Sequence, residues 1–127
     1  MPVNIQMRDG LVESFFHGDI GTDDFQEMAE FYRDVEARLE VTPDRIADLS
    51  GANFMSLDAD ILRRFAAGRA RMPLKNRVKS AIIAPQPEQF GLARMFQTYN
   101  ENPLIETKLF RDGVSAYEWL GRAARPA

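Results

Sequence analysis

Short apolar segments alternate along this chain with longer stretches in which apolar residues recur at helical spacing. The clearest such stretch follows Thr22 and Asp23, either of which can cap a helix. Because strands that alternate with helices need crossover connections, this pattern predicts an α/β fold with a mainly parallel sheet. In that helix, the predicted buried face comprises Phe25, Met28, Ala29, Tyr32, Val35 and Leu39, and the predicted exposed face carries Glu27, Glu30, Asp34 and Glu36.

Turn and breaker residues divide the rest of the chain into further elements. Asp9-Gly10 predicts a tight turn between antiparallel strands at residues 3–8 and 11–17. Ser50-Gly51 predicts the end of a strand, and Ser56 predicts the cap of the next helix. The order is then β-β-α-β-α-β-α-β-α, in a single α/β domain over residues 1–127 with an N-terminal antiparallel hairpin. The remaining strands are expected at 45–49, 78–84 and 106–111, and the helices are expected to end near residues 71, 100 and 124. The last helix should bury Ala116, Trp119, Leu120 and Ala123.

The composition excludes several classes of protein. The 127 residues include no cysteine and one histidine, His17, which excludes thiol catalysis, a disulfide scaffold and a metal site with two histidine ligands. Asp48, Asp58 and Asp60 could supply paired carboxylates, but acids at the start of a helix are explained by its dipole. No Gly-rich phosphate loop is present. We therefore expect no catalytic, metal-binding or cofactor-binding residue.

Neither a membrane-spanning segment nor a signal peptide is recognisable in the sequence. Apolar runs never exceed five residues, which is too short for a transmembrane helix. The first residues also lack the apolar region of a signal peptide. We therefore expect no transmembrane segment and a cytoplasmic location.

Charge is distributed unevenly. Residues 1–62 are strongly acidic, whereas residues 63–79 contain seven basic residues and no acid. A solvated helix face and loop explain this best. Nucleic acid is disfavoured as a partner, because only Phe65 offers a stacking surface there and the sequence pI is about 5.2. An anionic membrane surface is a further alternative, and so is contact with the acidic first helix across a homodimer interface.

Three segments of the chain resemble the STAS domain, named for sulfate transporters and anti-sigma-factor antagonists, and in particular its SpoIIAA-like branch. They are residues 45–58 (RIADLSGANFMSLD), residues 79–84 with 91–96 (KSAIIA and GLARMF), and residues 109–120 (LFRDGVSAYEWL). With the order of elements, the resemblance covers about residues 3–121. It implies a SpoIIAA-like fold, which is related to the fold of the CRAL-TRIO lipid carriers.

The resemblance also points to a regulatory position. In anti-sigma-factor antagonists, an Asp-Ser-Ser-Gly segment follows this strand, and a partner kinase phosphorylates its second serine. Aligning residues 48–51 (DLSG) with the end of the family's strand puts residues 56–59 (SLDA) at that segment. The acceptor position is then Asp58, which a serine kinase cannot phosphorylate. We therefore do not carry the phosphorylation switch over to this chain.

Two functional hypotheses follow. The resemblance and the missing catalytic groups favour a non-enzymatic regulatory or protein-interaction module, whose partner is an unidentified protein or a second copy of the chain. The alternative is a carrier or sensor of a lipid or other hydrophobic small molecule. It is suggested by side chains outside the helical stripes that could line a pocket, although core packing explains them more simply. These side chains are Phe31, Phe54, Phe90, Met55 and Met72.

Either partner is expected at one edge of the sheet. Parallel sheets bind ligands beyond the carboxyl ends of their strands, which here precede residues 50–56, 85–94 and 111–113. The candidate partner or ligand surface therefore comprises Ser50, Asn53, Ser56, Asp58 and Arg94.

Overall fold

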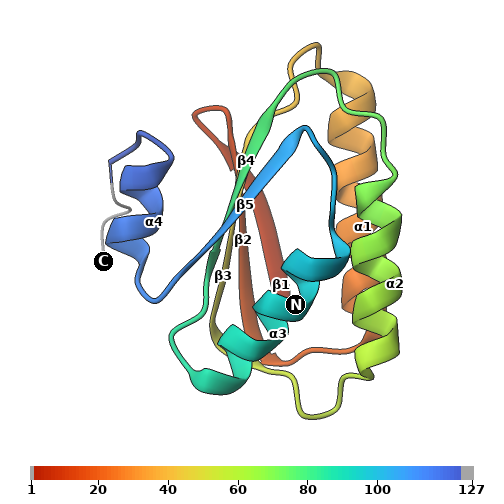
Figure 1. Ribbon diagram of the computed structural model, residues 1–127, viewed down its shortest axis with the longest axis vertical. Coiled ribbons are helices and arrows are strands. Elements are labelled where there is room, and N and C mark those ends of the chain that lie inside the picture. Colours follow the sequence, from red (N-terminus) through yellow and green to blue (C-terminus); the bar gives the residue numbers. More distant parts are fainter. Residues whose placement is uncertain (1, 124–127) are drawn as a thin grey trace.

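Five strands form one sheet in the spatial order β1-β2-β3-β4-β5 in the computed structural model, which describes residues 2–123 (Figure 1). Strands β1 (Val3–Arg8) and β2 (Leu11–Asp19) form an antiparallel hairpin. Strands β3 (Asp44–Asn53), β4 (Val78–Ile83) and β5 (Ile105–Phe110) continue the sheet, with β2 to β5 all parallel. The predicted α/β architecture and order of elements are confirmed.

Three helices cover one face of the sheet and the fourth covers part of the other (Figure 1). They are α1 (Thr22–Arg38), α2 (Ala59–Ala70), α3 (Pro87–Tyr99) and α4 (Gly113–Trp119). The crossovers from β2 to β5 all step in the same direction along the sheet, and such crossovers are right-handed. They must therefore place α1, α2 and α3 on the same face, which leaves the opposite face to α4.

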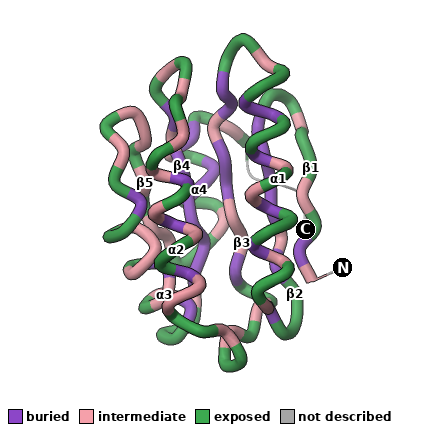
Figure 2. The backbone as a smooth tube through the Cα atoms, turned by 90° about the vertical axis from the view of Figure 1, so that its right-hand side faces the viewer, coloured by how far each residue is buried: buried purple, intermediate pink, exposed green. Residues whose placement is uncertain are grey.

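The larger core lies between the sheet and α1 to α3. Four residues of the predicted stripe in α1, Phe25, Met28, Tyr32 and Val35, are buried, as Figure 2 shows along the inner side of that helix. The prediction was wrong for Glu36, which is buried rather than part of the solvated acidic face. Helix α1 also begins one or two residues earlier than predicted, since neither Thr22 nor Asp23 is its N-cap. Its N-cap is Gly21, whose backbone N–H donates to the Asp24 carboxylate at 2.8 Å.

The smaller core lies under α4. Ala116, Tyr117 and Leu120 pack there against strand residues that include Leu11 and Ile83. The helix was predicted to run to residue 124, which lies outside the described residues, but it ends at Trp119, and Ala123 is exposed rather than buried.

Gly121 explains this early end. Its φ of 73° is a left-handed conformation that terminates helices. The backbone N–H of Arg122 then bonds the carbonyl of Tyr117 at 2.9 Å, which closes a Schellman motif.

Strand β3 is longer than the sequence predicted. Ser50-Gly51 does not end it, because the chain continues beside the end of β2 to Asn53. The pairing shifts register between Phe15 and His17, and a Cβ on Gly51 would lie 3.0 Å from the carbonyl oxygen of Phe16. Gly51 thus serves a close backbone approach rather than a turn. Helix α2 accordingly starts later, and its cap is Asp58 rather than Ser56.

Candidate functional site

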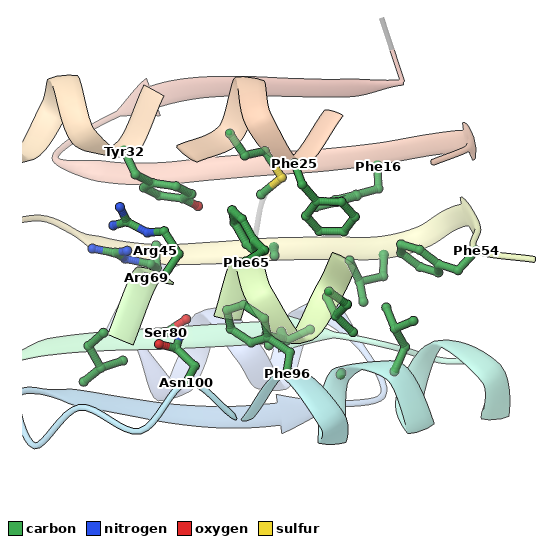
Figure 3. Close-up of a pocket in the computed structure, with 18 residues that line it drawn as sticks. Phe16, Phe25, Tyr32, Arg45, Phe54, Phe65, Arg69, Ser80, Phe96 and Asn100 are labelled. Atoms are coloured by element: carbon green, nitrogen blue, oxygen red, sulfur yellow. The ribbon is translucent and has the colours of Figure 1, made fainter. Parts of the chain in front are cut away.

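The larger core contains a cavity of about 70 Å³ between the sheet and helices α1, α2 and α3 (Figure 3). It is apolar along most of its length and polar at one end. Its lining residues are Phe16, Phe25, Met28, Tyr32, Arg45, Ala47, Leu49, Phe54, Leu62, Phe65, Arg69, Ser80, Ile82, Leu92, Ala93, Phe96, Asn100 and Ile105.

Aromatic rings from different elements form the apolar part of the cavity wall. Phe65 on α2 packs against Phe25 on α1 and Phe96 on α3, with ring centroids 5.0 and 6.0 Å apart. Phe16 and Phe54 pair at 6.2 Å, further along the cavity in Figure 3. Of the residues predicted to lie outside the helical stripes, Phe54 therefore lines a pocket. In contrast, Met55 is 91% exposed.

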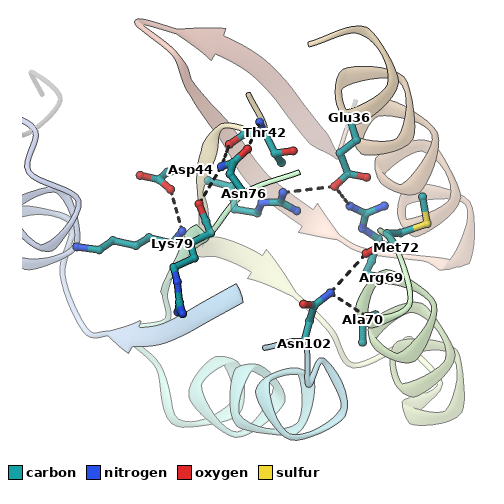
Figure 4. A network of polar contacts seen from close by, with 11 residues as sticks. Glu36, Thr42, Asp44, Arg69, Ala70, Met72, Asn76, Lys79 and Asn102 are labelled. Atoms are coloured by element: carbon teal, nitrogen blue, oxygen red, sulfur yellow. Dashed lines mark hydrogen bonds and ion pairs between the residues drawn. The ribbon is translucent and has the colours of Figure 1, made fainter. Parts of the chain in front are cut away.

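Two arginines lie together at the polar end. The guanidinium carbons of Arg45 on β3 and Arg69 on α2 lie 4.7 and 5.1 Å from the ring centroid of Tyr32 (Figure 3). Both residues are buried, at 8% and 6% exposure. Each donates from Nη2 to the same carboxylate oxygen of Glu36, Oε2, at 3.4 Å from Arg45 and 2.5 Å from Arg69. In Figure 4, dashed lines mark the contacts of Glu36, including the one with Arg69.

The charges of this cluster do not balance, because two cations share one carboxylate in a buried environment. Burial lowers the pKa of Arg69, the hydrogen bond that Arg69 donates to Glu36 opposes that change, and the nearby positive charge of Arg45 reinforces the lowering. The cavity lining contains these two arginines and, within residues 2–123, no acidic side chain. The wall of the cavity is therefore positively charged at this end.

Five buried side-chain polar atoms lack a hydrogen-bond partner among the residues that the structure describes. They include Nε of Arg45, a donor, and Oδ1 of Asn100, both from residues of the cavity wall. The others are Oε1 of Glu36, Oγ1 of Thr42 and Oγ1 of Thr107. Buried polar atoms are nearly always hydrogen-bonded in native proteins, so a group of unpaired ones marks a place for water or a ligand.

A shallow surface depression adjoins the cavity at the end of α3 and the start of β5. It shares Asn100 and Ile105 with the cavity wall and also contacts Thr107. The two shared side chains therefore separate the polar end of the cavity from the protein surface. The depression is lined by Gln97, Asn100, Glu101, Asn102, Pro103, Ile105 and Thr107.

The predicted partner or ligand surface lies elsewhere. Ser50 and Asn53 belong to the extended end of β3, Ser56 and Asp58 precede α2, and Arg94 lies on α3; all five are exposed and none lines the cavity. Asp58 caps α2 by accepting from the backbone N–H of Asp60 at 2.9 Å, and Asn53 accepts from that of Met55 at 2.9 Å. The position aligned with the kinase target is thus a helix cap.

The basic stretch at residues 63–79 is mostly, but not entirely, a solvated surface. Arg63 and Arg64 are exposed and pair with Asp60. Arg69 is buried, so the prediction of a solvated face was wrong at that position. The acidic first helix and the basic stretch do meet, and they do so within one chain, at Glu36 and Arg69.

A second buried acid, Glu13 on β2, was missed by sequence reasoning. It is fully buried and accepts hydrogen bonds from Arg8 (2.9 and 3.1 Å), Gln6 (3.1 Å) and the Tyr117 hydroxyl (2.5 Å). Burial alone would raise the pKa of Glu13, but these hydrogen bonds lower it to about 2. Burial and the bond to Glu13 raise the pKa of Tyr117 to about 12. The hydrogen bonds of this cluster link α4 to the β1–β2 hairpin.

No protein-family model and no curated protein sequence matches this chain. A similar solved structure is that of an uncharacterised protein from the DUF3478 family, with a SpoIIAA-like fold, from Shewanella loihica PV-4. The TM-score is 0.62 at 16% sequence identity, and the match covers 93% of this chain and 91% of the other. The chain has a SpoIIAA-like fold. The fold that the resemblance implied is confirmed.

Among residues 2–123, no group of three or more His, Asp or Glu side chains is arranged to hold a metal ion. None of the helices in the described part of the chain is both long and apolar enough to cross a membrane.

Proposed function

We propose that this chain is a non-enzymatic, STAS-like regulatory module of the cytoplasm that senses a small hydrophobic molecule in its core. The cavity between the sheet and α1 to α3 is the observation that carries the proposal. A well-packed interior contains few voids larger than a water molecule. Here a cavity of about 70 Å³, walled by aromatic rings, adjoins unpaired buried polar atoms.

The size of the cavity limits the ligand. An engineered apolar cavity of roughly 150 Å³ accommodates benzene. At about 70 Å³, this cavity fits a small molecule or the end of a chain, rather than a whole lipid, unless the helices move apart. Three of its walls are helices joined to the sheet by loops, so occupancy can alter their packing. That coupling is what a sensor requires.

Native mass spectrometry of the protein, purified gently from its own host, tests this proposal. We expect a mass above the 14.4 kDa of the chain by one discrete small-molecule increment. Ala47→Val adds methyl groups to the cavity wall at a strand position that favours β-branched residues, and it should remove the increment. A bare chain mass together with a ligand-free organic extract would contradict the proposal.

A second candidate function, binding of another protein, is favoured by the loop at residues 54–58. Met55 is 91% exposed there, in a loop that contains two local hydrogen bonds. Asn53 accepts from the Met55 N–H, and the carbonyl of Phe54 accepts from the Leu57 N–H at 3.0 Å. An exposed methionine offers an adaptable apolar contact for a partner.

Site-specific photo-crosslinking in the host tests this second candidate. A photoreactive residue at position 55 should give a discrete crosslinked product. The matched control is position 41, because Val41 is another exposed apolar residue, at 67%, in the connection between α1 and β3. A product of twice the chain mass would identify a second copy as the partner. The same products from both positions, or none from position 55, would remove this candidate.

A further inference from the structure

The polar end of the cavity specifies the chemical class of the ligand. The described part of the cavity wall brings together two buried cations, Arg45 and Arg69, whose shared counter-ion is the single carboxylate of Glu36. A buried charge without full compensation is costly. A second anion beside Arg45 and Arg69 would balance the cluster, whereas a neutral ligand would leave the imbalance in place.

One unpaired group of the cavity wall, on the Arg45 side chain, matches a planar anion. Nε of Arg45 is a buried donor with no partner within residues 2–123. Guanidinium groups bind carboxylates through such N–H donors, in bonds about twice as strong as those between neutral groups. The excess positive charge of Arg45 and Arg69 and the unpaired Nε–H of Arg45 therefore both favour a carboxylate on the ligand.

The rest of the wall selects an apolar tail. Beyond the arginines, the cavity continues between Phe25, Phe65 and Phe96, which offer no polar group to a ligand (Figure 3). The adjoining surface depression shares Asn100 and Ile105 with the cavity wall, which offers a ligand a route from the surface past these two residues. A ligand with a charged head and a short apolar tail could therefore occupy the cavity without burying the head among the rings.

We propose that the cavity binds a small monocarboxylate, with its carboxylate beside Arg45 and Arg69 and its short apolar tail among the phenylalanine rings. This inference rests on the proposed sensing function and narrows it from hydrophobic molecules in general to amphipathic anions. The volume of about 70 Å³ restricts the tail to a few carbon atoms.

The test titrates ¹⁵N-labelled full-length protein with three probes and follows the Nε–H resonance of Arg45 by NMR. Butanoate combines head and tail, butanamide has a neutral head, and acetate lacks most of the tail. Butanoate should shift the Arg45 resonance with one site per chain. Butanamide should bind about ten- to a hundredfold more weakly, because it loses charge-assisted hydrogen bonds. Acetate should bind about fifteenfold more weakly, because it has two methylenes fewer and each buried methylene adds about fourfold.

Substitutions in and near the cavity test whether butanoate binds there. Arg69→Met leaves Arg45 and Glu36 as a balanced pair and should weaken butanoate about tenfold or more. Arg63→Met, on an exposed position of the same helix, should leave the affinity unchanged. If Arg69→Met does not fold, Ala47→Val keeps both arginines, fills the space for the tail and should abolish binding.

The outcomes separate this inference from the function on which it rests. Equal binding of butanoate and butanamide would overturn the anionic class and leave a hydrophobic sensor. Binding that survives both Arg69→Met and Ala47→Val would place the carboxylate on another surface and overturn the site. Failure of every probe at millimolar concentrations would also overturn the inference, whereas the native mass of protein from the host decides the sensing function independently.

Discussion

Each face of the sheet buries a carboxylate with arginine partners, but only one of the two clusters is complete. On the α4 face, Glu13 accepts bonds through both carboxylate oxygens, from Arg8, Gln6 and Tyr117. On the opposite face, both arginines of the cluster bond one oxygen of Glu36, and its other oxygen has no partner in the described part of the chain.

The difference separates a structural cluster from one that a ligand can complete. The Glu13 cluster pairs one carboxylate with one arginine and joins the hairpin to α4, so its hydrogen bonds stabilise the fold. The Glu36 cluster carries an excess positive charge and lies at the end of a cavity. Stability alone does not explain such an arrangement, since apolar residues of similar volume often stabilise a core as well or better.

The largest effect is expected from Glu13→Ala. The substitution removes the partner of Arg8 and Tyr117 and leaves a cavity beneath α4, so we expect a loss of about 4 kcal/mol in the free energy of unfolding. Chemical denaturation measures it. Glu30→Ala on the exposed face of α1 is the control and should change stability by less than about 0.5 kcal/mol. Equal effects of the two substitutions would mean that the Glu13 cluster does not support the fold.

Acid should weaken the same cluster. The pKa of Glu13 is lowered from 4.5 to about 2, so its contribution to stability is complete above pH 4.5 and is lost as the pH falls towards 2. A lowering of this size corresponds to about 3 kcal/mol. Denaturation of wild type and Glu13→Gln across this range should show a stability difference that shrinks with acid. A difference that stays constant would contradict the assignment.

Tyr117→Phe should have a smaller effect, because it removes one hydrogen bond and keeps the buried ring. The lost bond is to an ionised carboxylate, and we expect a cost of about 2 kcal/mol. Tyr99→Phe, at an exposed position of α3, is the matched control and should be neutral. Thermal or chemical unfolding of both variants distinguishes the specific bond from a general effect of removing a hydroxyl.

The two clusters also show which features could not be predicted from local sequence patterns. Helical spacing predicted the buried residues of α1, and Asp9-Gly10 predicted the hairpin turn, because both depend on residues close in the chain. Nothing local distinguishes Glu36 from Glu30 or Asp34 as an acid on that helix. Its burial depends on Arg69, which is 33 residues away. Similarly, Glu13 is recognisable only with Tyr117, 104 residues later.

The position of the candidate ligand surface was also difficult to predict from the sequence. The carboxyl ends of the strands were a reasonable expectation for a ligand, but the cavity has its polar end at Arg45, near the start of β3. Turn residues were misleading at Ser50-Gly51, where Gln89 on α3 bonds the carbonyls of Ser50 and Ala52 and holds the chain in an extended form. Only the packing of α3 against β3 reveals this.

The smallest expected change in stability is the sharpest test of the comparison. Arg69→Met replaces a buried cation with an apolar side chain of similar length and leaves Arg45 to pair with Glu36. Because the excess charge disappears, we expect the free energy of unfolding to change by less than about 1 kcal/mol in either direction. Arg8→Met, in the complete cluster, should cost at least about 2 kcal/mol, since it leaves Glu13 buried without its cation. Chemical denaturation of the two variants under identical conditions makes the comparison directly. If Arg69→Met costs as much as Arg8→Met, the Glu36 cluster is as much a structural device as the Glu13 cluster, and its charge imbalance no longer argues for a ligand.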